Sequence, residues 1–147
     1  MVETYPYNLG FGAIAQYVPS ALDREIAKIK SKISKQLTIV HYPIYTAMPG
    51  YPTQESVYML DSTLHWAYVM NGFSGAEPKG FHNDMQILSG LPNIESINLL
   101  HKNKVNVLAI HNAVPEQTRR EIKQFFEETK TGVVTPVGSD EYLVLLR

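Results

Sequence analysis

The chain contains no cysteine among its 147 residues, which excludes disulfide bonds, thiolate catalysis and cysteine-based zinc sites. Its five histidines are scattered, with no pair at i, i+4 and no HExxH motif, so spacing predicts no metal site. Phosphate-binding glycine loops are missing too, because Gly10 and Gly12 have neither a preceding strand nor a third glycine. We therefore expect no metal and no cofactor.

Neither sign of charge dominates, since 13 basic and 14 acidic residues give a formal net charge of −1. The one basic cluster falls on a predicted helix between Lys28 and Lys35, and we interpret it as a solvated face rather than a nucleic-acid site. No apolar run approaches the roughly 18 residues of a membrane span. The N-terminus also lacks the pattern of a signal peptide. We expect a soluble chain that binds no nucleic acid.

What is present favours one globular domain with a hydrophobic core, because 44% of the residues are hydrophobic and 18% are charged. Residues 1–19 are rich in Tyr, Gly and Pro and show no sustained period, so we expect an irregular lead-in segment. Residues 20–147 are expected to form a single α/β domain.

Periodicity and turn signals predict an alternation of helices and strands along that domain. A capping-box pattern at Ser20 and Asp23 opens the first helix, and its apolar stripe consists of Leu22, Ile26, Ile29 and Ile33. Further helices are predicted over 81–88, 91–100 (with Pro92 in the first turn) and 115–130 (with Gly132 as its stop). The predicted strands are 37–42, 57–60, 67–70, 105–110, 133–137 and 142–146.

This order indicates a three-layer α/β fold, with a mainly parallel sheet, helices on both faces and a C-terminal antiparallel hairpin. Polar residues stand where three predicted strands end, at His41, Asn71 and His111. Ligands of open α/β sheets gather beyond the carboxyl ends of the strands, so these residues point to a site.

The segment 62–75, STLHWAYVMNGFSG, carries unusual polar chemistry for a buried region. We expect Trp66 to be a buried anchor and His65 to be hydrogen-bonded to the main chain. Gly72 and Gly75 are expected to form turns with positive φ and so to shape a structural loop. The ligand-binding candidates are His65, Trp66, Asn71, Ser74 and His111.

Two stretches, Tyr58–Trp66 (YMLDSTLHW) and Val69–Gly75 (VMNGFSG), resemble a segment of the soluble C-terminal domain of polytopic membrane glycosyltransferases. These belong to the C superfamily, which uses polyprenyl-phosphate-linked sugars, and show the pattern YMxSTxHW…NGYSG…GVRYVVVH. Lys104–His111 (KVNVLAIH) and Ser139–Leu146 (SDEYLVLL) follow in the family's order, whereas His41 stands where Glu is common.

The resemblance implies an accessory domain on the extracytoplasmic face of the membrane, with no catalytic residue of its own. Its partners would be the membrane-embedded portion of the parent protein and a saccharide or lipid-linked acceptor. Two alternatives stay open: a free-standing small-molecule-binding α/β module, and a hydrolase that uses His65 or His111 with Asp61. Nothing around Ser62 resembles a GxSxG nucleophile elbow.

Overall fold

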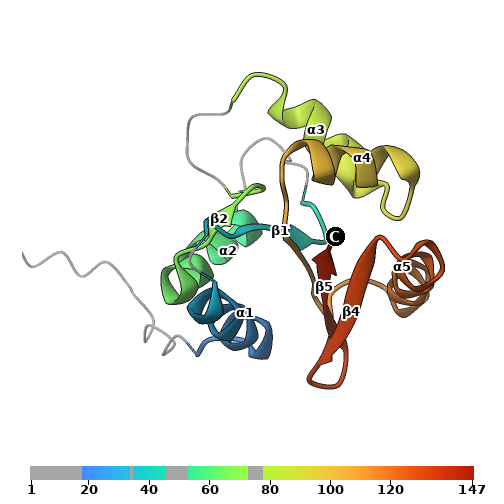
Figure 1. The fold of residues 1–147 in the computed structure, drawn as a ribbon. Coiled ribbons are helices and arrows are strands. Elements are labelled where there is room, and N and C mark those ends of the chain that lie inside the picture. The colour runs from blue at the N-terminus through green and yellow to red at the C-terminus, as the bar shows by residue number, and fades with distance from the viewer. Residues whose placement is uncertain (1–17, 34, 46–52, 73–77) are drawn as a thin grey trace, which may run out of the picture.

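The computed structural model describes residues 18–33, 35–45, 53–72 and 78–147 (Figure 1). Most of the expected lead-in segment, Ser74 and Gly75 lie outside the described residues. Five helices and five strands are described, in an α/β order that agrees with the predicted fold class.

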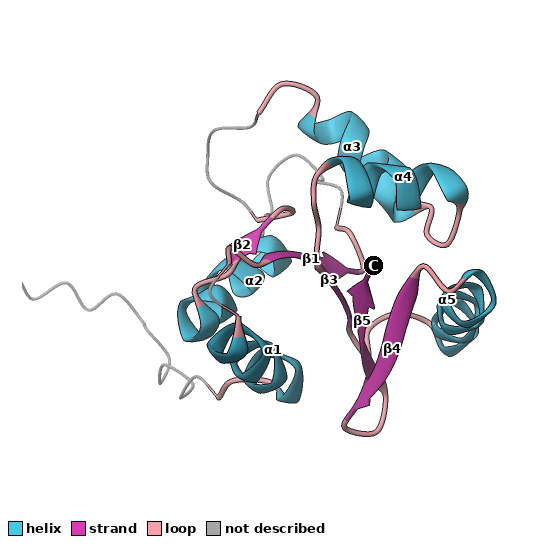
Figure 2. Ribbon diagram, viewed as in Figure 1, coloured by secondary structure: helices cyan, strands magenta, loops and turns pink. Residues whose placement is uncertain are grey.

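Five strands form one mixed sheet in the order β2-β1-β3-β5-β4 (Figure 2). β1 pairs in parallel with β2 and β3, whereas β5 pairs antiparallel with β3 and β4. The predicted C-terminal hairpin is confirmed, but parallel pairings do not dominate, because two of the four are antiparallel. The strands are β1 (Thr38–Tyr42), β2 (Tyr68–Val69), β3 (Val107–Ile110), β4 (Gly132–Val137) and β5 (Glu141–Leu146).

The side chains of the strands alternate between two hydrophobic clusters. Ile39 of β1 packs in the cluster that holds Leu22 and Ile26 of α1 (Ala21–Lys32). Val40, the next residue, packs in the larger cluster, to which α3 (Phe81–Ser89), α4 (Ile94–Lys102) and α5 (Glu116–Thr129) contribute. This alternation is the period of two expected for a strand with helices over both its faces.

The first helix begins as predicted. The Ser20 hydroxyl accepts from the Asp23 N–H at 3.1 Å, and the Asp23 carboxylate accepts from the Ser20 N–H at 3.2 Å, which completes the capping box. Leu22 and Ile26 are fully buried, and Ile29 packs beside them. Ile33 lies beyond the helix, as its C-cap, and is exposed.

The prediction of a strand at 57–60 is wrong, because these residues belong to α2 (Thr53–His65). Tyr58, Asp61 and His65 are its buried residues in the part whose side chains are described, at spacings of three and four. That is a helical period. The apolar residues Val57 and Leu60 are exposed, so hydrophobic content suggested a strand while the buried face of the helix is largely polar.

Two helix boundaries also differ from prediction. Asn93 caps α4 by accepting from the Ser96 N–H at 2.8 Å, so Pro92 precedes the helix rather than lying in its first turn. Lys130 ends α5 in the left-handed conformation, with φ of 55°, and Gly132 already belongs to β4. Ile122 and Phe126 of α5 are buried.

Candidate functional site

Two histidines and one glutamate meet where the parallel strands β1 and β3 end. His41 lies on β1, on the same face as Ile39, and His111 follows β3 directly. The register of β3 and β5 pairs Ile110 with Tyr142, which places His111 beside Glu141 at the next position. These three side chains therefore lie at the carboxyl ends of β1 and β3, where ligands of open α/β sheets gather.

Direct contacts join His41, His111 and Glu141 into one row, which we call the histidine row. The His41 Nδ1 lies 2.9 Å from the His111 Nε2, within hydrogen-bond distance. The His111 Nδ1 lies 3.7 Å from the Glu141 Oε1. Tyr58 of α2 stacks on both imidazoles, with ring centroids 4.5 Å from His41 and 4.9 Å from His111.

The row leads from solvent into the interior. The His111 and Glu141 side chains are 13% and 14% exposed, whereas His41 and Tyr58 are buried. Burial lowers the pKa of His41 well below its usual value of 6.5, and the nearby His111 and His65 lower it further. His41 is therefore neutral near pH 7, and its tautomer decides whether it donates to His111 or accepts from it.

Asn71 holds the backbone of His41 in place. Its Oδ1 accepts from the His41 N–H at 3.0 Å, and its Nδ2 donates to the His41 carbonyl at 2.8 Å. Asn71 lies just beyond the short strand β2. Its side chain thus makes the two hydrogen bonds with His41 that the backbone of a longer β2 would make. Asn71 is buried, so its role is to position His41 rather than to face solvent.

His65 lies behind the row, at the end of α2. Its Nδ1 accepts from the Ala67 N–H at 3.1 Å, which agrees with the predicted hydrogen bond to the main chain. Burial lowers the pKa of His65 below 6.5, partly offset by Asp23. His65 is also close enough to lower the pKa of His41, so it belongs electrostatically to the same group.

The prediction of a buried Trp66 is wrong, because 82% of its surface is exposed. Trp66 is the residue at which α2 ends: its φ is 51°, in the left-handed region, and its N–H donates to the Ser62 carbonyl at 2.7 Å. This reversal turns the chain into β2 and directs Trp66 outward. Of the candidates, His65, Asn71 and His111 thus gather around His41, and Trp66 does not.

The prediction of a positive φ at Gly72 is wrong. Gly72 is not among the described glycines with positive φ, which are Gly80 and Gly138. A Cβ at Gly72 would lie 2.3 Å from the Met59 Sδ and 3.3 Å from the Val69 carbonyl oxygen. The nearest obstacle to a side chain at Gly72 is therefore the flexible side chain of Met59, and not a positive φ.

Three members of the site, His41, Tyr58 and Glu141, were not among the predicted candidates. His41 had been noted only as a polar strand end, and Tyr58 was assigned to a strand. Tyr58, Asp61 and His65 are spaced as one face of a helix, and that period is the signal that could have identified them. No sequence signal places Glu141, because its approach to His111 depends on the pairing of β5 with β3.

The hydroxyls near the proposed hydrolase residues have local partners. The Ser62 hydroxyl donates to the Met59 carbonyl at 2.6 Å, and the Thr63 hydroxyl donates to the Leu60 carbonyl at 2.7 Å. Both bonds run back along α2, which is common for Ser and Thr in helices. Ser62 is therefore engaged with its own helix.

Comparison with known proteins found no matching family model, no matching curated protein and no matching solved structure. Across the described ranges, no helix combines the length and the apolar character that crossing a membrane requires. Within the same ranges, no group of three or more His, Cys, Asp or Glu residues could hold a metal ion.

Proposed function

We propose that the chain is an extracytoplasmic accessory domain of an integral-membrane glycosyltransferase-like protein. The resemblance of YMLDSTLHW and NGFSG to that family motivates the proposal. In this role the domain does not transfer sugar itself. It positions a saccharide or lipid-linked acceptor, or it covers the active site of the membrane-embedded portion.

The observation that carries the proposal is the outward face of α2 and β2. Leu60 and Tyr68 are 50% and 55% exposed, and Val57, Leu64 and Trp66 are exposed beside them in sequence. Val57, Leu60 and Leu64 recur at spacings of three and four, so they share one face of α2. An exposed apolar face of this kind favours an interaction site. Leu60, Leu64 and Trp66 belong to the stretch Tyr58–Trp66 that resembles the family, so the membrane-embedded portion is the partner that we assign to this face.

The row of His111, His41 and Glu141 gives the proposed domain a place for an acceptor. A solvent-facing imidazole and a carboxylate provide hydrogen-bond donors and acceptors suited to sugar hydroxyls. Tyr58 and Asn71 hold the row rigidly, since one stacks on the rings and the other fixes the backbone of His41.

Site-specific photo-crosslinking in the full-length protein, in membranes, tests the docking. A benzoylphenylalanine at Leu64 is expected to crosslink to the membrane-embedded portion of the same polypeptide. The matched control is Lys123, which is exposed on α5, on the other side of the sheet, and should give no such crosslink. The proposal fails if Leu64 gives no crosslink, or if the native reading frame encodes no membrane-spanning segment.

A second candidate is a free-standing small-molecule-binding module, which the polar row at the strand ends favours. A thermal-shift screen separates the two functions. Stabilisation by nucleotides, lost in His111→Ala, supports the binding module. Loss of sugar transfer in His111→Ala of the full-length protein, with no nucleotide effect, supports the accessory domain.

A further inference from the structure

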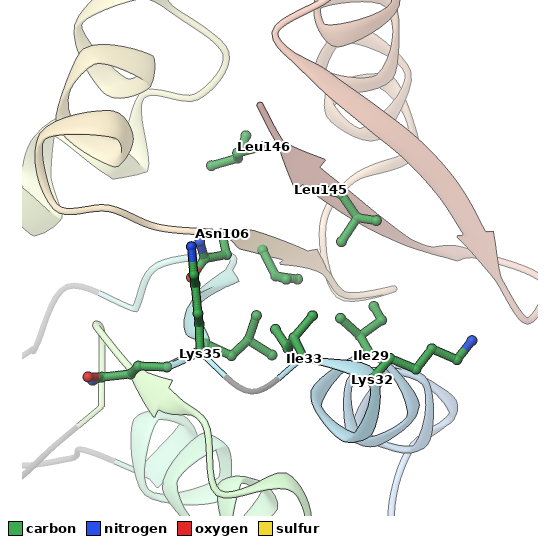
Figure 3. A pocket seen from close by; sticks show the side chains of 10 residues that line it. Ile29, Lys32, Ile33, Lys35, Asn106, Leu145 and Leu146 are labelled. Carbon is green, nitrogen blue, oxygen red and sulfur yellow. The ribbon is translucent and has the colours of Figure 1, made fainter.

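A cavity of about 570 Å³ opens at the end of the sheet opposite the histidine row. It lies at the amino ends of β1 and β3, beside the last turn of α1 (Figure 3). Its volume is within the range of roughly 300–1,000 Å³ that small-molecule sites occupy. Ten residues line it: Ile29, Lys32, Ile33, Lys35, Gln36, Leu37, Asn106, Val107, Leu145 and Leu146.

The walls of the cavity are aliphatic. Leu37 and Val107 are almost fully buried and form part of the lining, and Ile29 and Leu145 are partly buried. Because α1 ends at Lys32, the helix does not cover the sheet beyond this point, and Ile33 stays exposed. An alkyl chain placed here would remove apolar surface from water, at about 25 cal/mol per Å².

The polar groups around the cavity are mainly donors. Lys32 and Lys35 each carry an ammonium group, and none of the ten lining residues is acidic. Among the described residues, neither lysine takes part in an ion pair. The carbonyl of Lys35 already accepts from the Nζ of Lys30 at 3.0 Å.

Asn106 adds a further donor. Its Oδ1 accepts from the Thr38 N–H at 2.9 Å, and its own N–H donates to the Thr38 carbonyl at 2.9 Å. The remaining polar group of the side chain is the Nδ2 amide NH2, which can only donate. Figure 3 shows Lys35 extending toward Asn106, while Lys32 extends outward from α1.

We propose that this cavity binds an anionic amphiphile, a molecule with an alkyl chain and one carboxylate or phosphate group. The chain lies between Ile29, Val107 and Leu145, and the anion meets Lys35, the Nδ2 of Asn106 and a repositioned Lys32. Charge complementarity selects this ligand class, because the rim offers cations and an amide donor but no carboxylate. The proposal is independent of the proposed function, since it concerns the opposite end of the sheet.

Isothermal titration with decanoate and with decyl phosphate, each below its micellar concentration, tests the ligand class. Decanol is the neutral control with the same chain. We expect saturable one-to-one binding of at least one anion, at least about tenfold tighter than decanol, which corresponds to about 1.4 kcal/mol. Equal binding of decanol, or association only at micellar concentrations, would overturn the proposal.

Two variants locate the site. Lys32→Gln/Lys35→Gln should weaken the anion about tenfold and leave decanol unchanged, because charge-assisted hydrogen bonds are lost. Ile33→Trp should weaken both ligands by filling the mouth of the cavity. Lys28→Gln/Lys123→Gln removes the same charge elsewhere and should leave binding unchanged.

Amide chemical shifts give a readout that does not depend on affinity. Bound decanoate or decyl phosphate should shift the resonances of Asn106 and Leu145 and leave those of His111 and Glu141 in place. Unchanged affinity in both cavity variants, or shifts confined to His111 and Glu141, would refute the assignment. Thermal unfolding of each variant confirms that it is folded.

Discussion

His41 is an imidazole buried within an apolar strand, with His111, Tyr58 and Asn71 around it. Asn71 fixes its backbone and His111 and Tyr58 contact its ring, while its Nε2 has no hydrogen-bond partner among the described residues. The sequence LTIVHY indicated a buried strand ending in a polar residue. It could not indicate the ring contact with His111, which lies 70 residues away and depends on the parallel pairing of β1 and β3.

Stability should fall as the pH is lowered below about 6.5. Both His41 and His65 have pKa values below 6.5 in the folded chain, so the unfolded chain binds protons more readily. Their contribution is fully present above pH 6.5 and is lost as the pH falls toward their folded pKa values. For His41, the loss is at most about 1.4 kcal/mol per pH unit.

Urea unfolding at pH 7.5 and pH 5.0 measures this effect. We expect a lower midpoint at pH 5.0 and a smaller difference between the two midpoints in His65→Gln. Equal midpoints at the two pH values in the unsubstituted chain would contradict the assignment of neutral, buried imidazoles.

Asn71→Ala should destabilise the fold by about 2–4 kcal/mol, because it leaves the buried N–H and carbonyl of His41 without their partner. Asn112→Ala is the matched control, since Asn112 is exposed and should change stability by less than about 0.5 kcal/mol. Chemical denaturation compares the two variants. Equal stabilities would show that the side chain of Asn71 does not hold β1.

Among the elements, α2 shows where sequence reasoning failed and why. The capping box of α1 and the apolar stripe that follows it are local signals, and both led to the correct helix. In α2 the buried residues Tyr58, Asp61 and His65 are partly polar, while apolar residues face outward. An assignment that places hydrophobic residues inside is wrong for such a segment, because the apolar residues of α2 lie on its exposed side.

Gly72 and Gly138 allow two causes of glycine dependence to be separated. Gly72→Ala should destabilise by about 1 kcal/mol or less, because the flexible, partly exposed Met59 side chain must move away from the added Cβ. Gly138→Ala should cost about 1 kcal/mol through its φ of 64°, with nothing within 4 Å of the added Cβ.

Second substitutions in each background test the two causes. Met59→Ala should restore part of the stability lost in Gly72→Ala, and Gly138→Asn should be tolerated better than Gly138→Ala, because Asn adopts positive φ more readily. Thermal unfolding measures both comparisons. If Met59→Ala gave no recovery, overpacking would not be the cause at Gly72.

In the molecule taken as a whole, the histidine row, the aliphatic cavity and the exposed apolar residues occupy three separate regions. The histidine row lies at the carboxyl ends of the parallel strands and the aliphatic cavity lies at their amino ends. The exposed apolar residues lie on α2 and at β2, the edge strand of the sheet. The class of fold and the polar strand ends could be predicted from periodicity. The sheet order, Glu141 and the cavity could not, because they arise from contacts distant in sequence.

The exposed face of α2 and β2 should make the isolated chain self-associate at high concentration. Leu60, Leu64, Trp66 and Tyr68 present apolar surface to water, and a second copy can cover it. Leu64→Gln/Trp66→Gln should lower the association constant at least about tenfold and leave thermal unfolding of the monomer nearly unchanged, because these residues lie outside the core. Val133→Gln, an exposed apolar position on β4, is the control and should have no such effect. Sedimentation velocity over a concentration series measures the association. A chain that remains monomeric throughout, or a Leu64→Gln/Trp66→Gln variant that associates as before, would show that this face is not adhesive in solution.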